Sequence, residues 1–128
     1  MLIIHDEDVR GNRIHTLRVA NNDESLSVGD ILKRRIENEI TRFNLQRPVC
    51  FFSLVQPKNS EITPRGFRLR EHRAIDWETQ FQAAIEAFDK KGFIVNINGK
   101  DVQGLDDIID TSDVVEVVMI RCMEIVAG

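Results

Sequence analysis

Few side chains in this sequence have the types and spacing that chemistry requires. The histidines His5, His15 and His72 are scattered, and the sequence gives them no nucleophile–base pair, paired acids or zinc-type Cys/His spacing. His5 and His15 could meet across a hairpin, but a third metal ligand is not evident. Because acid–base and nucleophilic catalysis need such partners, the sequence predicts a protein that is not an enzyme and that holds no metal.

The stretch PRGFRLREHR (64–73) concentrates positive charge. It contains four arginines and one glutamate, Glu71, and so has a formal charge of +3. Because the net charge of the whole chain is −4, the remaining residues together carry −7. The four arginines are Arg65, Arg68, Arg70 and Arg73. Such a segment is typical of an exposed edge strand protected by charge. It is also typical of a surface that grips an acidic protein partner or a phosphate backbone. The acidic balance of the whole chain argues against nucleic acid.

The last eight residues, RCMEIVAG, are unusually apolar for a chain end. Strand alternation would place Glu124 in line with Ile120 and Cys122, and a charge on a buried face is costly. We therefore predict that the chain leaves its sheet near Glu124 and exposes Ile125 and Val126 in a flexible tail. Exposed apolar residues favour a surface covered by a partner, and the candidate contact residues are Arg121, Met123, Ile125 and Val126. The alternative is that these residues simply finish the sheet.

Composition places the chain among ordinary globular domains. Its 128 residues are 42% hydrophobic and 30% charged, which is enough for one domain with its own core. We expect no membrane association, because no apolar run reaches the length of a span and the start lacks a signal-peptide pattern. Cys50 and Cys122 lie in apolar runs, which predicts buried, reduced thiols. Together these features predict a cytoplasmic protein.

Local patterns predict the elements of the first two thirds. Residues 2–20 form a hairpin with alternating faces. A helix over 28–43 begins at the N-cap Ser27, with Asp30 completing a capping box. The run 49–55 has strand length, whereas 56–75 is irregular, with a short strand at FRLR. A second helix, about 77–91, starts at the N-cap Asp76 and buries a stripe of Phe81, Ala84, Ile85 and Phe88.

The last third is rich in strands. A strand at 93–97 turns at Asn98-Gly99 and returns over 100–102. The long run 114–126 is apolar on both faces, which favours a central strand covered at least in part on both sides. The order of elements predicts an α+β protein with a β-grasp, ubiquitin-like mixed sheet and a covering helix. We expect a single domain over 1–128, with an insertion at about 44–92 that carries the second helix.

The C-terminal third resembles the ubiquitin-like sulfur-carrier proteins of molybdopterin and thiamine synthesis. The matching residues, in chain order, are Ile97-Asn98-Gly99, Val102, Leu105-Asp106, Asp113 with Glu116-Val117, and Ile125-Val126-Ala127-Gly128. The helix start SVGDILKRRI also looks like that fold. The insertion at 44–92 has no counterpart in a minimal carrier, and Ala127 stands where those carriers have the first of two glycines.

The resemblance implies a chemistry for the chain end. A carrier or modifier of this kind has its C-terminal glycine, here Gly128 preceded by Ala127, activated by an adenylating enzyme. The partner enzyme uses the ATP, so the chain itself needs no cofactor. Glycine suits a narrow enzyme channel because it lacks Cβ. The alternative is a non-catalytic β-grasp module for protein–protein interaction that has lost the tail chemistry.

Overall fold

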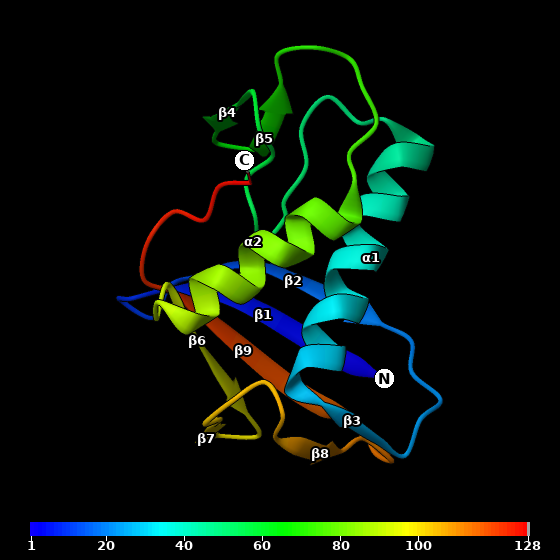
Figure 1. Ribbon diagram of the computed structural model, residues 1–128, viewed down its shortest axis with the longest axis vertical. Helices are drawn as coiled ribbons and strands as arrows, with labels where there is room; N and C mark the ends of the chain where they lie inside the picture. Colours follow the sequence, from blue (N-terminus) through cyan, green and yellow to red (C-terminus); the bar gives the residue numbers. More distant parts are fainter. Residues whose placement is uncertain (128) are drawn as a thin grey trace.

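The computed structural model describes residues 1–127, which form a mixed five-stranded sheet with two helices on one face (Figure 1). The strand order is β2-β1-β9-β6-β7. Strand β1 (Leu2–Asp8) pairs antiparallel with β2 (Arg13–Val19) and parallel with β9 (Val115–Arg121). Strand β6 (Phe93–Ile97) pairs antiparallel with β9 and with β7 (Lys100–Asp101). The α+β class and the central position of the final strand are confirmed.

Helix α1 (Val28–Gln46) crosses the inner face of this sheet (Figure 1). Its start is fixed as predicted: the Ser27 hydroxyl accepts the Asp30 N–H, and the Asp30 carboxylate accepts the Ser27 N–H. Its end lies three residues beyond the predicted Phe43, at a C-cap Arg47 with φ of 48° whose N–H donates to Phe43 O. The apolar stripe of α1 packs on the inward residues of the strands, which include Leu2, Ile4, Val117 and Met119.

The outer face of the sheet is less covered than the sequence predicted. Val115, Val117 and Met119 of β9 are buried beneath the helices, whereas Val118 and Ile120 on the opposite face are only half-buried. Strand β9 is therefore central in the sheet, between β1 and β6, but only its inner face is fully buried. A further short pair, β3 (Ser25–Ser27) with β8 (Ile108–Asp110), lies at the start of α1.

The insertion is better ordered than its composition predicts. Residues 49–55 are not a strand: only Phe51 forms an isolated bridge, to Phe67, while Leu54 and Val55 are buried. Residues 56–75 hold a hairpin of β4 (Ser60–Thr63) and β5 (Gly66–Leu69), the latter at the predicted FRLR. The segment 49–55 thus packs Phe51, Leu54 and Val55 against the core without joining the main sheet, and it leaves Val49 and Phe52 exposed.

Helix α2 (Trp77–Asp89) lies beside α1 and starts at Asp76, whose carboxylate accepts the N–H groups of Glu78 and Thr79. Its most buried side chains are Gln80, Ala84 and Ala87. The predicted Phe81, Ile85 and Phe88 are only half-buried. The face that α2 turns towards the core is therefore rotated from the predicted one and carries smaller side chains. The Gln80 side chain explains part of this rotation, because its amide donates to Val55 O at 3.0 Å and ties α2 to the buried segment.

Replacing Ile36 with alanine is expected to lower the free energy of unfolding by about 2–5 kcal/mol, because Ile36 is buried on the core face of α1. Urea denaturation of both proteins measures the change. Ala substitution of Leu45, which is exposed on the same helix, is the control and should cost far less. A loss below about 1 kcal/mol for Ile36→Ala would contradict the packing of this face.

Candidate functional site: the basic hairpin and the docked tail

The β4–β5 hairpin is shaped by its turn and by one glycine. Strand residues Thr63 and Gly66 are opposite each other, and the Thr63 hydroxyl donates to Gly66 O at 2.8 Å. Gly66 has φ of 108°, and a Cβ there would lie 2.3 Å from Phe51 O. Only glycine fits, because both the backbone angle and the close approach exclude a side chain. The exchange of hydrogen bonds between Phe67 and Phe51 then fixes the hairpin to the buried segment.

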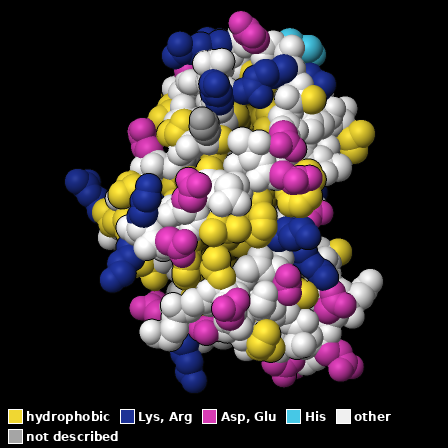
Figure 2. Space-filling model, viewed as in Figure 1, with side chains coloured by type: hydrophobic (Ala, Val, Ile, Leu, Met, Phe, Trp, Pro, Cys, Tyr) yellow, Lys and Arg dark blue, Asp and Glu magenta, His cyan; other side chains and the backbone are white. Residues whose placement is uncertain are grey.

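The four predicted arginines gather on this hairpin and the residues after it, a surface over 64–73 that we call the basic hairpin. Arg65, Arg68 and Arg70 are exposed and Arg73 is half-buried. Figure 2 shows a group of Lys and Arg side chains at the same end of the molecule, while acidic side chains and further Lys and Arg side chains are spread over the rest of this face. The arginines that stand close together in the sequence therefore also form one exposed group in the folded chain.

Two of these arginines have contacts within the chain. Arg68 forms an ion pair with Glu61, the residue opposite it on β4, and the Arg73 guanidinium donates to Lys58 O. Within residues 1–127 no carboxylate forms an ion pair with Arg65 or Arg70. An exposed pair such as Arg68–Glu61 contributes only about 0–1 kcal/mol, so at least three guanidinium groups remain available to a partner.

The chain leaves the main sheet after Arg121, three residues earlier than predicted. The N–H groups of Cys122 and Met123 donate to Gly92 O, which turns the chain away from β6. The segment 122–127 then runs along the insertion and ends near the β4–β5 hairpin (Figure 1). Cys122, predicted to be buried, is exposed because β9 has already ended, and Cys50 is half-buried; both are free thiols.

The tail is docked, which corrects the prediction that both Ile125 and Val126 would be exposed. Gln56 N–H donates to Ile125 O at 2.6 Å, and Ala127 N–H donates to Gln56 O at 2.9 Å. Ile125 is 5% exposed and Ala127 3%, whereas Val126 is 53% exposed. Two of the three residues are therefore part of the packed interior. Gly128, the predicted activation site, lies outside the described residues.

The other predicted partner-binding residues of the tail differ in exposure. Met123 is exposed. Arg121 is half-buried, and its guanidinium donates through Nη2 to Ser53 O at 3.1 Å, so it ties β9 to the insertion. Burial lowers the pKa of Arg121, an effect that the nearby Asp6 carboxylate partly offsets. Arg121 thus stabilises the chain's own fold, while Met123 and Val126 form the exposed part of the tail.

The histidines do not form a site. His5 and His15 lie on adjacent strands but on opposite faces of the sheet. His5 contacts Thr16 Oγ1 at 2.8 Å and Glu116 Oε2 at 3.3 Å on the outer face. In the part of the chain that the structure describes, His, Cys, Asp and Glu side chains form no group of three or more suited to a metal ion. None of the described helices is long and apolar enough to cross a membrane.

A buried charge cluster under the sheet was not foreseen from the sequence. Arg35 is 0% exposed; its guanidinium binds the Asp6 carboxylate through Nη1 and Nη2 and donates through Nε to Glu39. Arg35 and Glu39 stand four residues apart on α1, the spacing at which side chains meet on a helix, and they form an ion pair. Their positions between Leu32, Ile36, Ile40 and Phe43 on the apolar stripe were the available signal that the pair is internal. Asp6 gave no such signal, because it is followed directly by two further acidic residues, Glu7 and Asp8.

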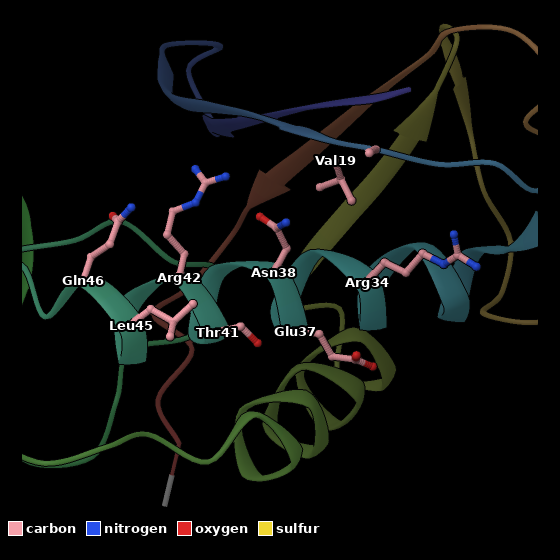
Figure 3. A pocket seen from close by; sticks show the side chains of 9 residues that line it. Val19, Arg34, Glu37, Asn38, Thr41, Arg42, Leu45 and Gln46 are labelled. Carbon is pink, nitrogen blue, oxygen red and sulfur yellow. The ribbon is translucent and has the colours of Figure 1, made fainter.

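A shallow groove of about 580 Å³ lies between the end of β2 and α1 (Figure 3). Asn38 and Arg42 project from α1 towards the strand that carries Val19, and Arg34 and Glu37 lie further along the helix. Arg34 is already engaged by Asp23 and by Asn21. The groove therefore has little free charge, and the basic hairpin is the surface better suited to a charged partner.

A comparison with known protein families, curated proteins and solved structures found no match for this chain.

Proposed function

We propose that this chain is a non-catalytic protein-interaction module with a β-grasp, ubiquitin-like fold, and that its basic hairpin binds an acidic segment of a partner protein. The fold assignment is supported by the strand order β2-β1-β9-β6-β7, with a parallel central pair and antiparallel pairs outside it. The helix that follows the first hairpin and covers one face also supports it. The same strand arrangement is expected of a β-grasp sheet.

The observation that carries the proposed function is the group of exposed arginines on the basic hairpin. Arg65 and Arg70 are exposed, and within residues 1–127 neither pairs with a carboxylate. Guanidinium groups present a fixed fork of donors that matches carboxylates. The segment 64–73 carries +3 on a chain of net charge −4. An acidic protein segment would be attracted to this end, whereas a long polyanion would also meet the −7 of the rest of the molecule.

The docked tail favours the module over a carrier whose Gly128 is activated by an adenylating enzyme. To enter such an enzyme the tail would have to release Ile125 and Ala127 and break both hydrogen bonds with Gln56. Exposing the isoleucine side chain alone costs about 1.5–3 kcal/mol. The carrier function therefore requires a partner that opens the tail, and the module does not.

The proposed function is tested with a fluorescein-labelled peptide rich in glutamate and its binding by anisotropy. We expect binding that weakens as salt rises from about 0.05 to 0.3 M, because the Debye length falls below about 10 Å. Reversing charge at Arg65 and Arg70 together, Arg65→Glu with Arg70→Glu, should weaken binding about tenfold or more at low salt. That factor corresponds to about 1.4 kcal/mol.

The matched control reverses two exposed lysines away from the hairpin, Lys90→Glu with Lys100→Glu, and changes the net charge equally. It should alter the affinity less than about threefold, since screened distant charges matter little. Equal losses in the two double variants would mean that only bulk charge is sensed. A labelled single-stranded DNA that binds more tightly than the peptide would replace the proposal with nucleic-acid binding.

A further inference from the structure

A second shallow groove, of about 700 Å³, runs over α2. Lys33 of α1 and Val126 of the docked tail line it, and its other lining residues belong to α2 and its N-cap. Figure 2 shows apolar side chains reaching the surface in the middle of this face, where α1 and α2 lie in Figure 1, with acidic side chains beside them. None of the arginines of the basic hairpin lines this groove, so the two surfaces are separate.

The groove contains apolar side chains that the chain itself does not cover. Trp77 and Phe81 of α2 are only half-buried, and their ring centroids lie 6.3 Å apart. Val126 is 53% exposed, although Ile125 and Ala127 on either side of it are buried. Apolar side chains that stay exposed within one groove favour a surface that a partner covers.

The charged side chains of the groove are mostly carboxylates. Asp76, Glu78 and Glu86 are exposed and stand against one cation, Lys33, which leaves a formal charge of −2 (one minus three). Within residues 1–127 no basic side chain forms an ion pair with any of these three carboxylates. The Lys33 Nζ lies 5.6 Å from the centre of the Trp77 ring. The groove therefore attracts positive charge, and its indole ring already accommodates one cation.

Two of these carboxylates are spaced along α2 at a distance that an extended chain matches. Glu78 and Glu86 lie eight positions apart and, with Gln82 midway between them, form one exposed row of the helix. Eight residues of α-helix rise about 12 Å. In an extended segment, residues i, i+2 and i+4 face the same way and span about 13 Å. Basic residues at i and i+4 can therefore reach both glutamates, with residue i+2 over the middle of the groove.

We propose that the groove on α2 binds an extended segment of a partner protein with the pattern Arg-x-Leu-x-Arg, in which Leu stands for a large apolar residue and x for any residue. The two guanidinium groups pair with Glu78 and Glu86, and the middle side chain packs on the apolar part of the groove. Arginine suits this surface better than lysine, because its planar guanidinium pairs with carboxylates and also stacks on aromatic rings. The proposal does not rest on the function of the basic hairpin.

The side chain of Trp77 reports binding directly, because it is the single tryptophan of the chain. The probe is the peptide acetyl-Gly-Arg-Ser-Leu-Ser-Arg-Gly-amide, titrated into the ¹⁵N-labelled full chain. NMR follows the indole N–H of Trp77 and the backbone amides of α2. We expect these signals to shift and to saturate, and the affinity to fall as salt rises from about 0.05 to 0.3 M.

Two control peptides test the charge and the spacing. One has glutamate in place of both arginines. The other has the same residues in the order Gly-Arg-Ser-Leu-Arg-Ser-Gly, so that the arginines are three apart and face opposite ways in an extended chain. Each should bind at least about threefold more weakly than the probe, the loss expected when an exposed ion pair is missing.

Paired variants of the chain locate the contact. Glu78→Gln with Glu86→Gln should weaken the probe about fivefold or more, and α2 should persist because glutamine is a good helix former. Glu24→Gln with Asp106→Asn removes the same charge from exposed positions outside the groove. This control should change the affinity less than about twofold. Equal losses in the two double variants would mean that the peptide senses only bulk charge, which overturns the proposal.

The wild-type chain alone also decides the matter. Unchanged indole and α2 signals at saturating probe, or equal binding of the probe and either control peptide, would contradict the proposed pattern. A shift of the Trp77 signal on concentrating the chain without peptide would assign the groove to a second copy of the chain instead.

Discussion

Replacing Arg35 with methionine is expected to lower the free energy of unfolding by about 3–5 kcal/mol. The substitution removes the cation that binds both Asp6 and Glu39, and it leaves two carboxylates buried without it. Burial by itself lowers the pKa of Arg35, but the charges of Asp6 and Glu39 outweigh burial and raise it, so the guanidinium stays protonated in the folded chain. Urea denaturation at neutral pH measures the loss.

Two further variants show whether the loss comes from unpaired charge. Lys33→Met is the matched control, because Lys33 is exposed on the same helix with a surface partner, Glu37, at 3.8 Å; we expect a change below about 1 kcal/mol. Adding Asp6→Leu and Glu39→Met to Arg35→Met should recover much of the stability, since buried ion clusters can be replaced by apolar side chains at little cost. A small loss for Arg35→Met, or no recovery in the triple variant, would contradict a buried network held by Arg35.

The stability of the chain is expected to fall by about 3 kcal/mol between pH 4.5 and 7 through Glu39 alone. Burial raises the pKa of Glu39 to about 7 from an ordinary value of 4.5, with Asp6 adding to the rise and Arg35 opposing it. In this window the unfolded chain releases the Glu39 proton while the folded chain keeps it. Folding is therefore favoured at the acidic end of the window, and the contribution is lost as pH rises through 7.

The measurement compares urea unfolding of the wild-type chain and Glu39→Gln at several pH values from about 4.5 to 8. Other carboxylates and the histidines titrate in both proteins, so the difference between the two curves isolates Glu39. The wild-type chain should lose stability relative to Glu39→Gln as pH rises to 7, and the difference should level off above it. Parallel curves across the range would mean that Glu39 is ionised in the folded chain throughout.

The elements with local signals were predictable from the order of the residues. The Ser27–Asp30 capping box, the Asp76 N-cap and the Asn98-Gly99 turn each act within a few residues, and the structure has all three. The two-sided apolar pattern of the final strand also sufficed to place it between β1 and β6. The apolar pattern is informative because a strand in the middle of a sheet has a neighbouring strand on each edge, and such strands are rich in apolar residues on both faces.

The basic hairpin was partly visible in the sequence. The arginines of 64–73 and a strand at FRLR were predicted, and both are present. The pairing of β4 with β5 was missed, because the strands are only four residues long and the segment has the composition of a loop. Gly66 shows why: its role depends on the approach of Phe51, which lies fifteen positions earlier and outside the hairpin.

The burial of the tail, the segment 49–55 and the charged side chains was not predictable in this way, because it depends on contacts between distant parts of the chain. Ile125 and Ala127 are buried because Gln56 offers them a backbone partner, and Arg35 is tolerated in the core because Asp6, 29 positions away, neutralises it. The run 49–55 has a strand's composition, yet Leu54 and Val55 are buried in the core while most of its backbone forms no ladder. Each outcome depends on contacts between distant residues, and whether a polar or apolar group is stable in the interior depends on the partner that reaches it there.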